Sequence, residues 1–283
     1  MVAMAMRSHA QLKALLDELY HRYSRPAFLS TDPISIPHEY RCPDDREIAA
    51  FVAASLAYGN VKQIHRSATA ALEAMGKSPA RFIRRFDPAR DPARLRHVVH
   101  RFNSGVDLAI LCYLLCQAIA TAGSLQAFFL KGHDPVHDDI EPALTSFVER
   151  MLSLDVSPFY PSGILPAKAG VRFFFPSPAG GSACKRLNLF LRWMVRRDDA
   201  IDFGLWTEVS PAKLIVPLDT HVARIARQLG LTRIKQANWR MATEVTRRLR
   251  AFDPEDPVKY DFALCRLGIL KQPIPDHRQA RLT

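Results

Sequence analysis

Glycine is scarce in this sequence, and it contains no CxxC pair and no long apolar segment. The 283 residues include 12 glycines and 20 prolines, which favours short stops between helices over glycine-rich β turns. No segment of about 18 residues is apolar throughout, and the first residues are too polar for a secretory signal. We therefore expect a cytoplasmic, mainly helical protein that has no membrane partner.

The five cysteines do not form a recognisable metal or disulfide framework. Their number is odd, and several lie inside apolar helical patterns, where a cysteine packs as a small hydrophobic residue. Cys112 and Cys116 share one helix face and would supply half of a metal site. No second pair or histidine cluster complements them, so no metal is expected.

The charge balance points to an anionic partner. The chain has 39 Lys and Arg against 28 Asp and Glu, a formal net charge of +11 at pH 7. DNA, RNA and membrane surfaces are all polyanions that such a protein attracts. A basic enzyme without affinity for any polymer fits the same charge, so the composition alone leaves the partner open.

Apolar residues recur at helical spacing along most of the chain. Asp44 is predicted to cap the second helix, with Glu47 three residues later. Residues 24–43 are predicted to form an extended connector, and residues 157–182, with five prolines, an ordered loop. The predicted helices span residues 9–24, 44–56, 62–75, 79–86, 106–120, 138–153, from about 183, 220–229, 239–251 and 257–268.

The helix predicted from about residue 183 contains four arginines in addition to its apolar stripe. They are Arg186, Arg192, Arg196 and Arg197, and they lie mostly on the side opposite the stripe. A solvated helix face and a phosphate-binding face are both consistent with this pattern.

One phrase of the sequence resembles a known superfamily. PLDTHVARIARQLGL, from Pro217 to Leu231, is similar to a segment of endonuclease III and adenine glycosylase relatives, which are helix-hairpin-helix DNA glycosylases. REIAAFVAASLAYGNVKQIHRSATAAL resembles the early helix pair of that superfamily, and MATEVTRRLRAFDPEDPVKYDFALCRLGI its closing helices. The chain as a whole also resembles a bacterial family of conserved proteins without an assigned function.

This resemblance implies an all-α, two-lobed fold. Residues 44–184 would form a central helical-barrel lobe, and residues 1–43 with 185–283 a second, discontinuous lobe. Two features of the superfamily are missing: the Leu-Pro-Gly-Val-Gly hairpin before the catalytic lysine, and the four-cysteine cluster of endonuclease III. The helix-hairpin-helix is therefore expected to be degenerate, and no iron–sulfur or other cofactor is expected.

The resemblance also assigns two catalytic residues. It implies that Asp219 is the catalytic carboxylate, and by position Lys185 corresponds to the attacking lysine, with a spacing similar to that of the archaeal 8-oxoguanine glycosylase group. A helix N-cap is the structural alternative for Asp219, and a surface residue in a basic run is the alternative for Lys185.

Further residues are predicted to contact nucleic acid. Before Lys185, the amides of Gly180, Gly181 and Ser182 would meet a phosphate, together with Arg186. Near Asp219, His221 either contacts nucleic acid or makes a local hydrogen bond. Tyr58 and Asn60 occupy the break in the early helix pair, where a ring and an amide would meet a displaced base, and Lys62 begins the next helix beside them. The alternative is an ordinary turn with a half-buried tyrosine.

Together these residues predict a DNA-binding base-excision protein. It would cleave the N-glycosidic bond of a damaged base, and Lys185 would add abasic-site lyase activity. The expected partner is nucleic acid, with DNA favoured over RNA. The alternative is a non-catalytic protein on the same scaffold that binds DNA or RNA. A helical metabolic or scaffolding protein with incidental charge is a third reading. The oligomeric state is left open.

Overall fold

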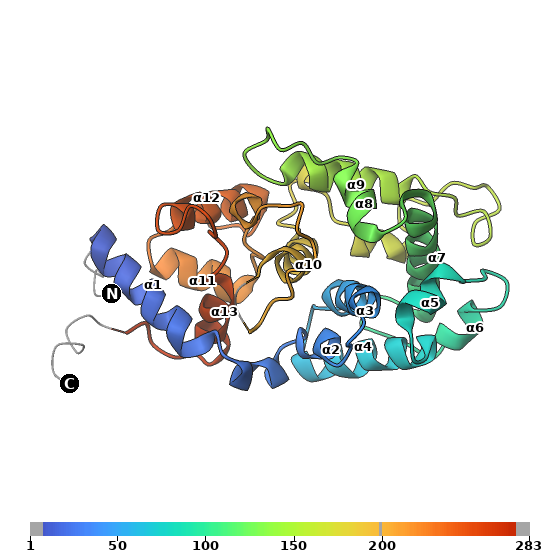
Figure 1. Ribbon diagram of the computed structural model, residues 1–283, viewed down its shortest axis with the longest axis horizontal. Helices are drawn as coiled ribbons and strands as arrows, with labels where there is room; N and C mark the ends of the chain where they lie inside the picture. Colours follow the sequence, from blue (N-terminus) through green and yellow to red (C-terminus); the bar gives the residue numbers. More distant parts are fainter. Residues whose placement is uncertain (1–7, 198–199, 276–283) are drawn as a thin grey trace.

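The computed structural model describes residues 8–197 and 200–275, and within these ranges the chain is all-α, with no β-strand (Figure 1). The all-α class expected from the sequence is thereby confirmed. The α-helices of the described chain are α1 (His9–Tyr23), α2 (Ser35–His38), α3 (Pro43–Ser55), α4 (Val61–Met75), α5 (Pro79–Arg84), α6 (Pro92–Leu95), α7 (Gly105–Ala122), α8 (Leu125–Leu130), α9 (Glu141–Leu152), α10 (Lys185–Val195), α11 (Thr220–Gln228), α12 (Trp239–Arg250) and α13 (Asp261–Ile269). Short 3-10 helices add η1 (Pro26–Thr31), η2 (Gly170–Phe174), η3 (Pro178–Gly180) and η4 (Pro211–Lys213).

All the longer helices predicted from periodicity are present, and their ends are set by local capping. Ser104 and Asp107 form a reciprocal capping box at the start of α7, and Asn60 and Asn238 cap α4 and α12. The structure adds three short helices, α2, α6 and α8, which are too brief to produce a clear hydrophobic period.

Two local predictions are wrong. Residues 24–43 are not extended, because η1 and α2 fold there into short helical turns. Asp44 does not cap α3: Cys42 is the N-cap residue and Pro43 occupies the first helical position, where its fixed φ suits the helix. Asp45 instead accepts hydrogen bonds from the Ser78 hydroxyl and the Ala80 amide at the start of α5.

The helices are arranged around α10. In Figure 1, α1 lies with α11, α12 and α13 at one end of the molecule, α4 to α9 lie at the other, and α10 lies between them beside α3. Helix α1 packs against α13 although the two are at opposite ends of the described sequence. The buried apolar residues form one connected cluster that spans both ends. The division into lobes at residue 184 stays a prediction.

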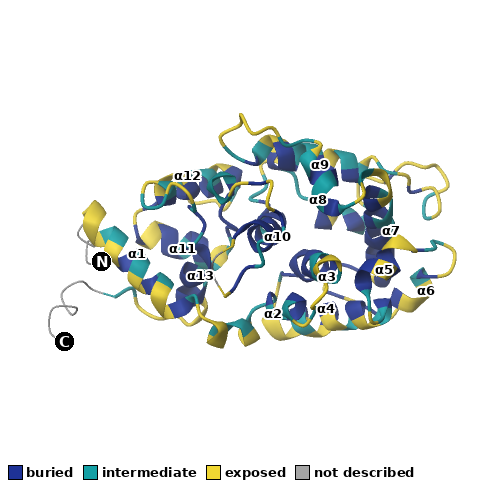
Figure 2. Ribbon diagram, in the orientation of Figure 1, coloured by how far each residue is buried: buried dark blue, intermediate teal, exposed yellow. Residues whose placement is uncertain are grey.

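The centre of the protein is therefore α10, and Figure 2 shows it and α3 as mostly buried. Every residue of α10 from Arg186 to Val195 is buried. Helix α7 is also mainly buried. By length and composition α7 is apolar enough to cross a membrane, but it packs against α5, α6, α8 and α9, as the core helix of a globular protein does.

A buried carboxyl group ties α3 to the segment that follows α10. The Trp206 indole donates a hydrogen bond of 2.6 Å to Glu47, and burial raises the pKa of Glu47 from 4.5 to about 6. The folded protein therefore holds this proton more tightly than the unfolded chain does. This contribution to stability is present below pH 4.5 and is lost as the pH rises through 6.

Glu47→Gln should remove this pH dependence. Relative to wild type, the variant is expected to gain up to about 2 kcal/mol in the free energy of unfolding between pH 4 and pH 7. Urea unfolding at pH 4, 5, 6 and 7 measures the difference, with Glu73→Gln on the exposed face of α4 as the control. If the free energies of unfolding of Glu47→Gln and wild type change with pH in the same way across this range, the prediction is wrong.

Candidate functional site

Asp219 is held in place at the start of α11. The preceding residues, Leu214–Leu218, are buried and fix the position from which the helix begins. Asp219 is the N-cap residue: its Oδ1 accepts the Val222 amide at 2.8 Å. Its Oδ2 accepts the Cys265 thiol at 3.7 Å. The N-cap role is thus real, but it uses one carboxylate oxygen and leaves the other turned toward α13.

Helix α13 supplies the wall that faces Asp219. Cys265 and Asp261 lie one helical turn apart, and the charge of Asp219 acts on both. Burial and the Asp219 carboxylate raise the pKa of the Cys265 thiol, so it is a protonated donor. The two helices are in close contact at Gly268, where a Cβ atom would lie 2.7 Å from the Cβ of His221. His221 is therefore half-buried against α13.

Lys185 reaches the same neighbourhood from α10. It is the first residue of that helix, and its Nζ donates to the Ala57 carbonyl at 2.9 Å. Its positive charge also lowers the pKa of Cys265, in opposition to Asp219. Charges in a protein act on a thiol at short range. The charges of Lys185 and Asp219 thus act on the pKa of Cys265 in opposite directions.

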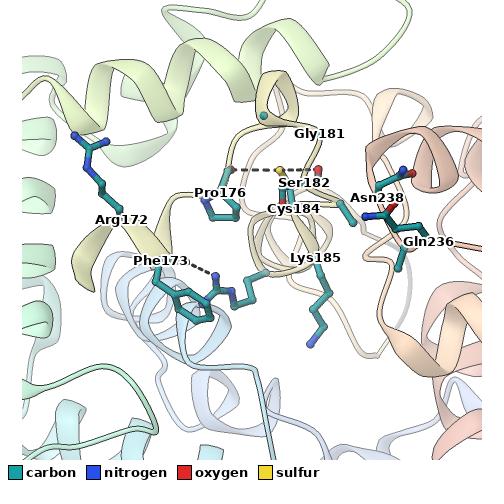
Figure 3. A pocket seen from close by; sticks show the side chains of 13 residues that line it. Arg172, Phe173, Pro176, Gly181, Ser182, Cys184, Lys185, Gln236 and Asn238 are labelled. Atoms are coloured by element: carbon teal, nitrogen blue, oxygen red, sulfur yellow. Dashed lines mark hydrogen bonds between the residues drawn. The ribbon is translucent and has the colours of Figure 1, made fainter. Parts of the chain in front are cut away.

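The loop before Lys185 lines a hollow of about 560 Å³ (Figure 3). Gly180 and Gly181 are exposed, the Ser182 hydroxyl accepts the Cys184 amide, and Cys184 adopts the left-handed conformation with φ at 47°. Gln236 and Asn238 face them from the start of α12. In Figure 3 the Lys185 side chain points away from this loop, so the amine and the glycine-rich turn occupy different parts of the hollow's lining.

The break between α3 and α4 is more firmly held than the sequence implies. Tyr58 is half-buried, and two acceptors lie within hydrogen-bonding distance of its hydroxyl, the His100 carbonyl at 2.8 Å and Asn103 Oδ1 at 2.7 Å. The Asn60 side chain caps α4 by accepting the Lys62 amide. Of the three candidate residues here, Lys62 alone carries a charge, and its side chain is exposed.

Neither interpretation of the arginines on α10 describes Arg192 and Arg196, and the prediction is wrong for both. They are 2% exposed and pair with buried acids: Arg192 with Asp202 and Asp261, and Arg196 with Asp202 and Asp256. The acids come from segments that follow α10, so spacing within the helix gives no sign of them.

Arg186 is also buried, but its partners are neutral. Its guanidinium donates to the carbonyl oxygens of Ser55 and Phe173, and burial lowers its pKa to about 10. Its side chain lines the hollow, and within the described residues no carboxylate pairs with it. A direct phosphate contact fits this geometry poorly, whereas the uncompensated charge makes the hollow attractive to anions.

Sequence reasoning missed several residues that the fold brings to this site. Cys265 was interpreted as a small hydrophobic residue, and Asp261 was not singled out at all. Their spacing of four residues within α13 is a weak signal, because pairs at that spacing are common in helices. Two exposed rings, Phe102 and Phe173, were also missed. Among the described residues, no group of three or more His, Cys, Asp or Glu side chains is arranged to hold a metal ion.

A family model described as "Protein of unknown function (DUF2400)" matches residues 32–270, so the chain belongs to this family. The matched range includes every candidate residue from Tyr58 to Cys265. No curated protein and no solved structure matches the chain. The function is therefore argued from the chemistry of the site.

Proposed function

We propose that this member of the DUF2400 family is a DNA-binding base-excision protein of the DNA glycosylase type. Asp219 is the electrostatic catalyst and Lys185 the attacking amine. The observation that carries the proposal is the fixed carboxylate of Asp219, whose two oxygens accept hydrogen bonds from the Val222 amide and the Cys265 thiol. This agrees with the glycosylase resemblance, in which the DTH phrase names Asp219 and Lys185 corresponds by position to the attacking lysine.

The chemistry suits an N-glycosidic bond. As the bond to the base breaks, positive charge develops on the sugar, and a fixed carboxylate stabilises it. The Val222 amide and the Cys265 thiol hold the two oxygens of Asp219, so the carboxylate needs little reorganisation during the reaction. Attack of the Lys185 nitrogen on C1′ expels the base and, after the sugar ring opens, leaves a Schiff base.

Cations around the hollow support a polyanionic substrate. Lys185 and Arg186 line it, together with Arg172, which is half-buried. Arg233, Lys235 and Arg240 are exposed in the segment that contains Gln236 and Asn238. The exposed side chains of Arg233, Lys235 and Arg240 neutralise phosphates along a strand whose damaged base enters the site.

A second candidate is a DNA- or RNA-binding protein without catalysis. One contact favours it: the Lys185 Nζ, which would attack the sugar, already donates a hydrogen bond to the Ala57 carbonyl. In that case Asp219 serves as the cap of α11 alone.

Borohydride trapping tests the proposal. The full-length protein is incubated with duplexes that carry 8-oxoguanine, uracil, an oxidised pyrimidine or an abasic site, and base release is measured in parallel. The proposal predicts salt-dependent binding to DNA, release of at least one damaged base and a covalent band after reduction. Salt-dependent binding without release or trapping supports the second candidate, and absence of all three overturns both.

Asp219→Asn is expected to separate catalysis from capping. Asparagine caps helices as well as aspartate does, so the free energy of unfolding should change by less than about 0.5 kcal/mol. Base release should fall about 100-fold, because the neutral amide does not stabilise the positive sugar. Thermal unfolding and single-turnover base release measure the two effects. Ser124→Asn, a cap exchange at α8, should alter neither. Equal release by Asp219→Asn and wild type would leave Asp219 only its structural role.

A further inference from the structure

Three aromatic rings meet on the surface beside Lys185. Phe102 is 68% exposed and stacks on Tyr58, with ring centroids 5.8 Å apart and planes inclined by 11°. Phe173 is 39% exposed and lies edge-on to both rings. We call Tyr58, Phe102 and Phe173 the aromatic step. Phe102 is its most exposed ring. Packing within this chain does not explain why so large an apolar side chain stays in contact with water.

The turn that carries Phe102 is rigidly anchored. His100 and Asn103 exchange backbone hydrogen bonds of 2.9 Å, so Arg101 and Phe102 form the tip of a tight turn. The Tyr58 hydroxyl binds the His100 carbonyl, the His100 ring binds the Tyr58 carbonyl, and the Asn103 amide donates to the Gly170 carbonyl. The exposed ring is therefore held in one place before any partner arrives.

This tip also has a strained backbone. Arg101 has φ at 53°, a conformation that few residues other than glycine adopt. Below it lies Gly59, with φ at 91°, where a Cβ atom would lie 2.9 Å from the Arg101 side chain. Strain of this kind persists where the surroundings fix it, and it is concentrated at binding sites.

The charges near the step select an anionic partner. The Arg101 guanidinium lies 5.1 Å from the centroid of Phe102, and Arg186 lies 3.9 Å from that of Phe173. Lys62 is exposed at the start of α4, close in sequence to Tyr58. Exposed rings beside cations match a nucleic-acid strand, in which flat bases alternate with phosphates.

We propose that Phe102, supported by Tyr58 and Phe173, is a stacking platform for an unpaired nucleobase. The platform adjoins the candidate catalytic amine: Lys185 binds the Ala57 carbonyl next to Tyr58, and Phe173 lines the same hollow as Lys185. The stacked base belongs to the strand that enters this hollow. The inference rests on the proposed binding of nucleic acid, and it does not depend on bond cleavage.

Oligonucleotides that contain 2-aminopurine test the platform, because this base changes its fluorescence when it stacks. Binding of full-length protein to single-stranded DNA, single-stranded RNA and a duplex with an unpaired 2-aminopurine is followed by anisotropy and by quenching. Phe102→Ala should weaken binding by roughly 5- to 100-fold and remove the quenching, since each stacked base contributes about this much. The dependence of affinity on salt should keep its slope, because no phosphate contact is lost.

Two variants make the test specific. Phe102→Leu keeps an apolar side chain without a ring and should resemble Phe102→Ala. Ile164→Ala removes another exposed apolar side chain, 73% exposed, and should bind as wild type does. Wild-type affinity and quenching in Phe102→Ala would overturn the platform, and so would a dimer that dissociates on this substitution while its DNA binding is unchanged. If the wild-type protein binds none of the oligonucleotides, both the platform and the proposed function are wrong.

Discussion

Lys185→Gln is expected to abolish the covalent band in borohydride trapping. The band requires an amine that forms a Schiff base with the sugar, and glutamine has no nucleophilic nitrogen of this kind. DNA binding should weaken only modestly, because one cation among many is lost. Glutamine still donates to the Ala57 carbonyl that holds the Lys185 Nζ, so the start of α10 should keep its fold.

Lys213→Gln is the matched control. Lys213 is also half-buried, and its Nζ also donates to backbone carbonyls, those of Pro135 and His137. This variant removes one lysine whose ammonium group is held by backbone carbonyls in the same way. It should trap as wild type does. A band that persists in Lys185→Gln at wild-type intensity would assign the nucleophile to another residue.

Arg192→Leu is expected to lower the free energy of unfolding by about 3–5 kcal/mol, the largest effect on stability that the structure predicts. Arg192 donates to Asp261 at 2.5 Å and to Asp202 at 3.2 Å, and all three side chains are almost completely buried. Removing the guanidinium leaves Asp261 without its counter-ion in an apolar environment. Chemical denaturation measures the loss.

Two comparisons sharpen this result. Arg22→Leu breaks an exposed pair with Glu18 within α1, and such pairs contribute less than about 1 kcal/mol. Combining Arg192→Leu with Asp261→Asn removes the orphaned charge and should recover part of the stability. A loss below about 1 kcal/mol in Arg192→Leu would mean that the buried network is not a major support of the fold.

The helices could be predicted because their signals are local. The apolar stripe of Val222, Ile225 and Ala226 follows directly after Asp219, and an aspartate before such a stripe is a standard helix start. The same reasoning placed α4, α7, α9 and α12 correctly. It was wrong at Asp44, where the preceding Pro43 begins the helix one residue earlier.

The candidate site could be predicted only in part. Asp219 and Lys185 were found through a resemblance, not through their spacing. Cys265 was not found, because a cysteine in an apolar helix has the same sequence pattern whether it faces the core or a carboxylate. Phe102 was missed for a similar reason: HRFNSG contains turn-forming residues, but the pattern does not say that the ring remains exposed.

The sequence by itself determined the all-α class, the principal helices and the cap at Asp219, since each depends on residues within a few positions of one another. Only the tertiary structure decided which arginines are buried and which rings are exposed. It also decided that Asp219 and Cys265 meet, because α11 and α13 pack against each other although they are separated in the sequence. A helical period identifies the face that is buried, and it does not identify the partner against which that face packs.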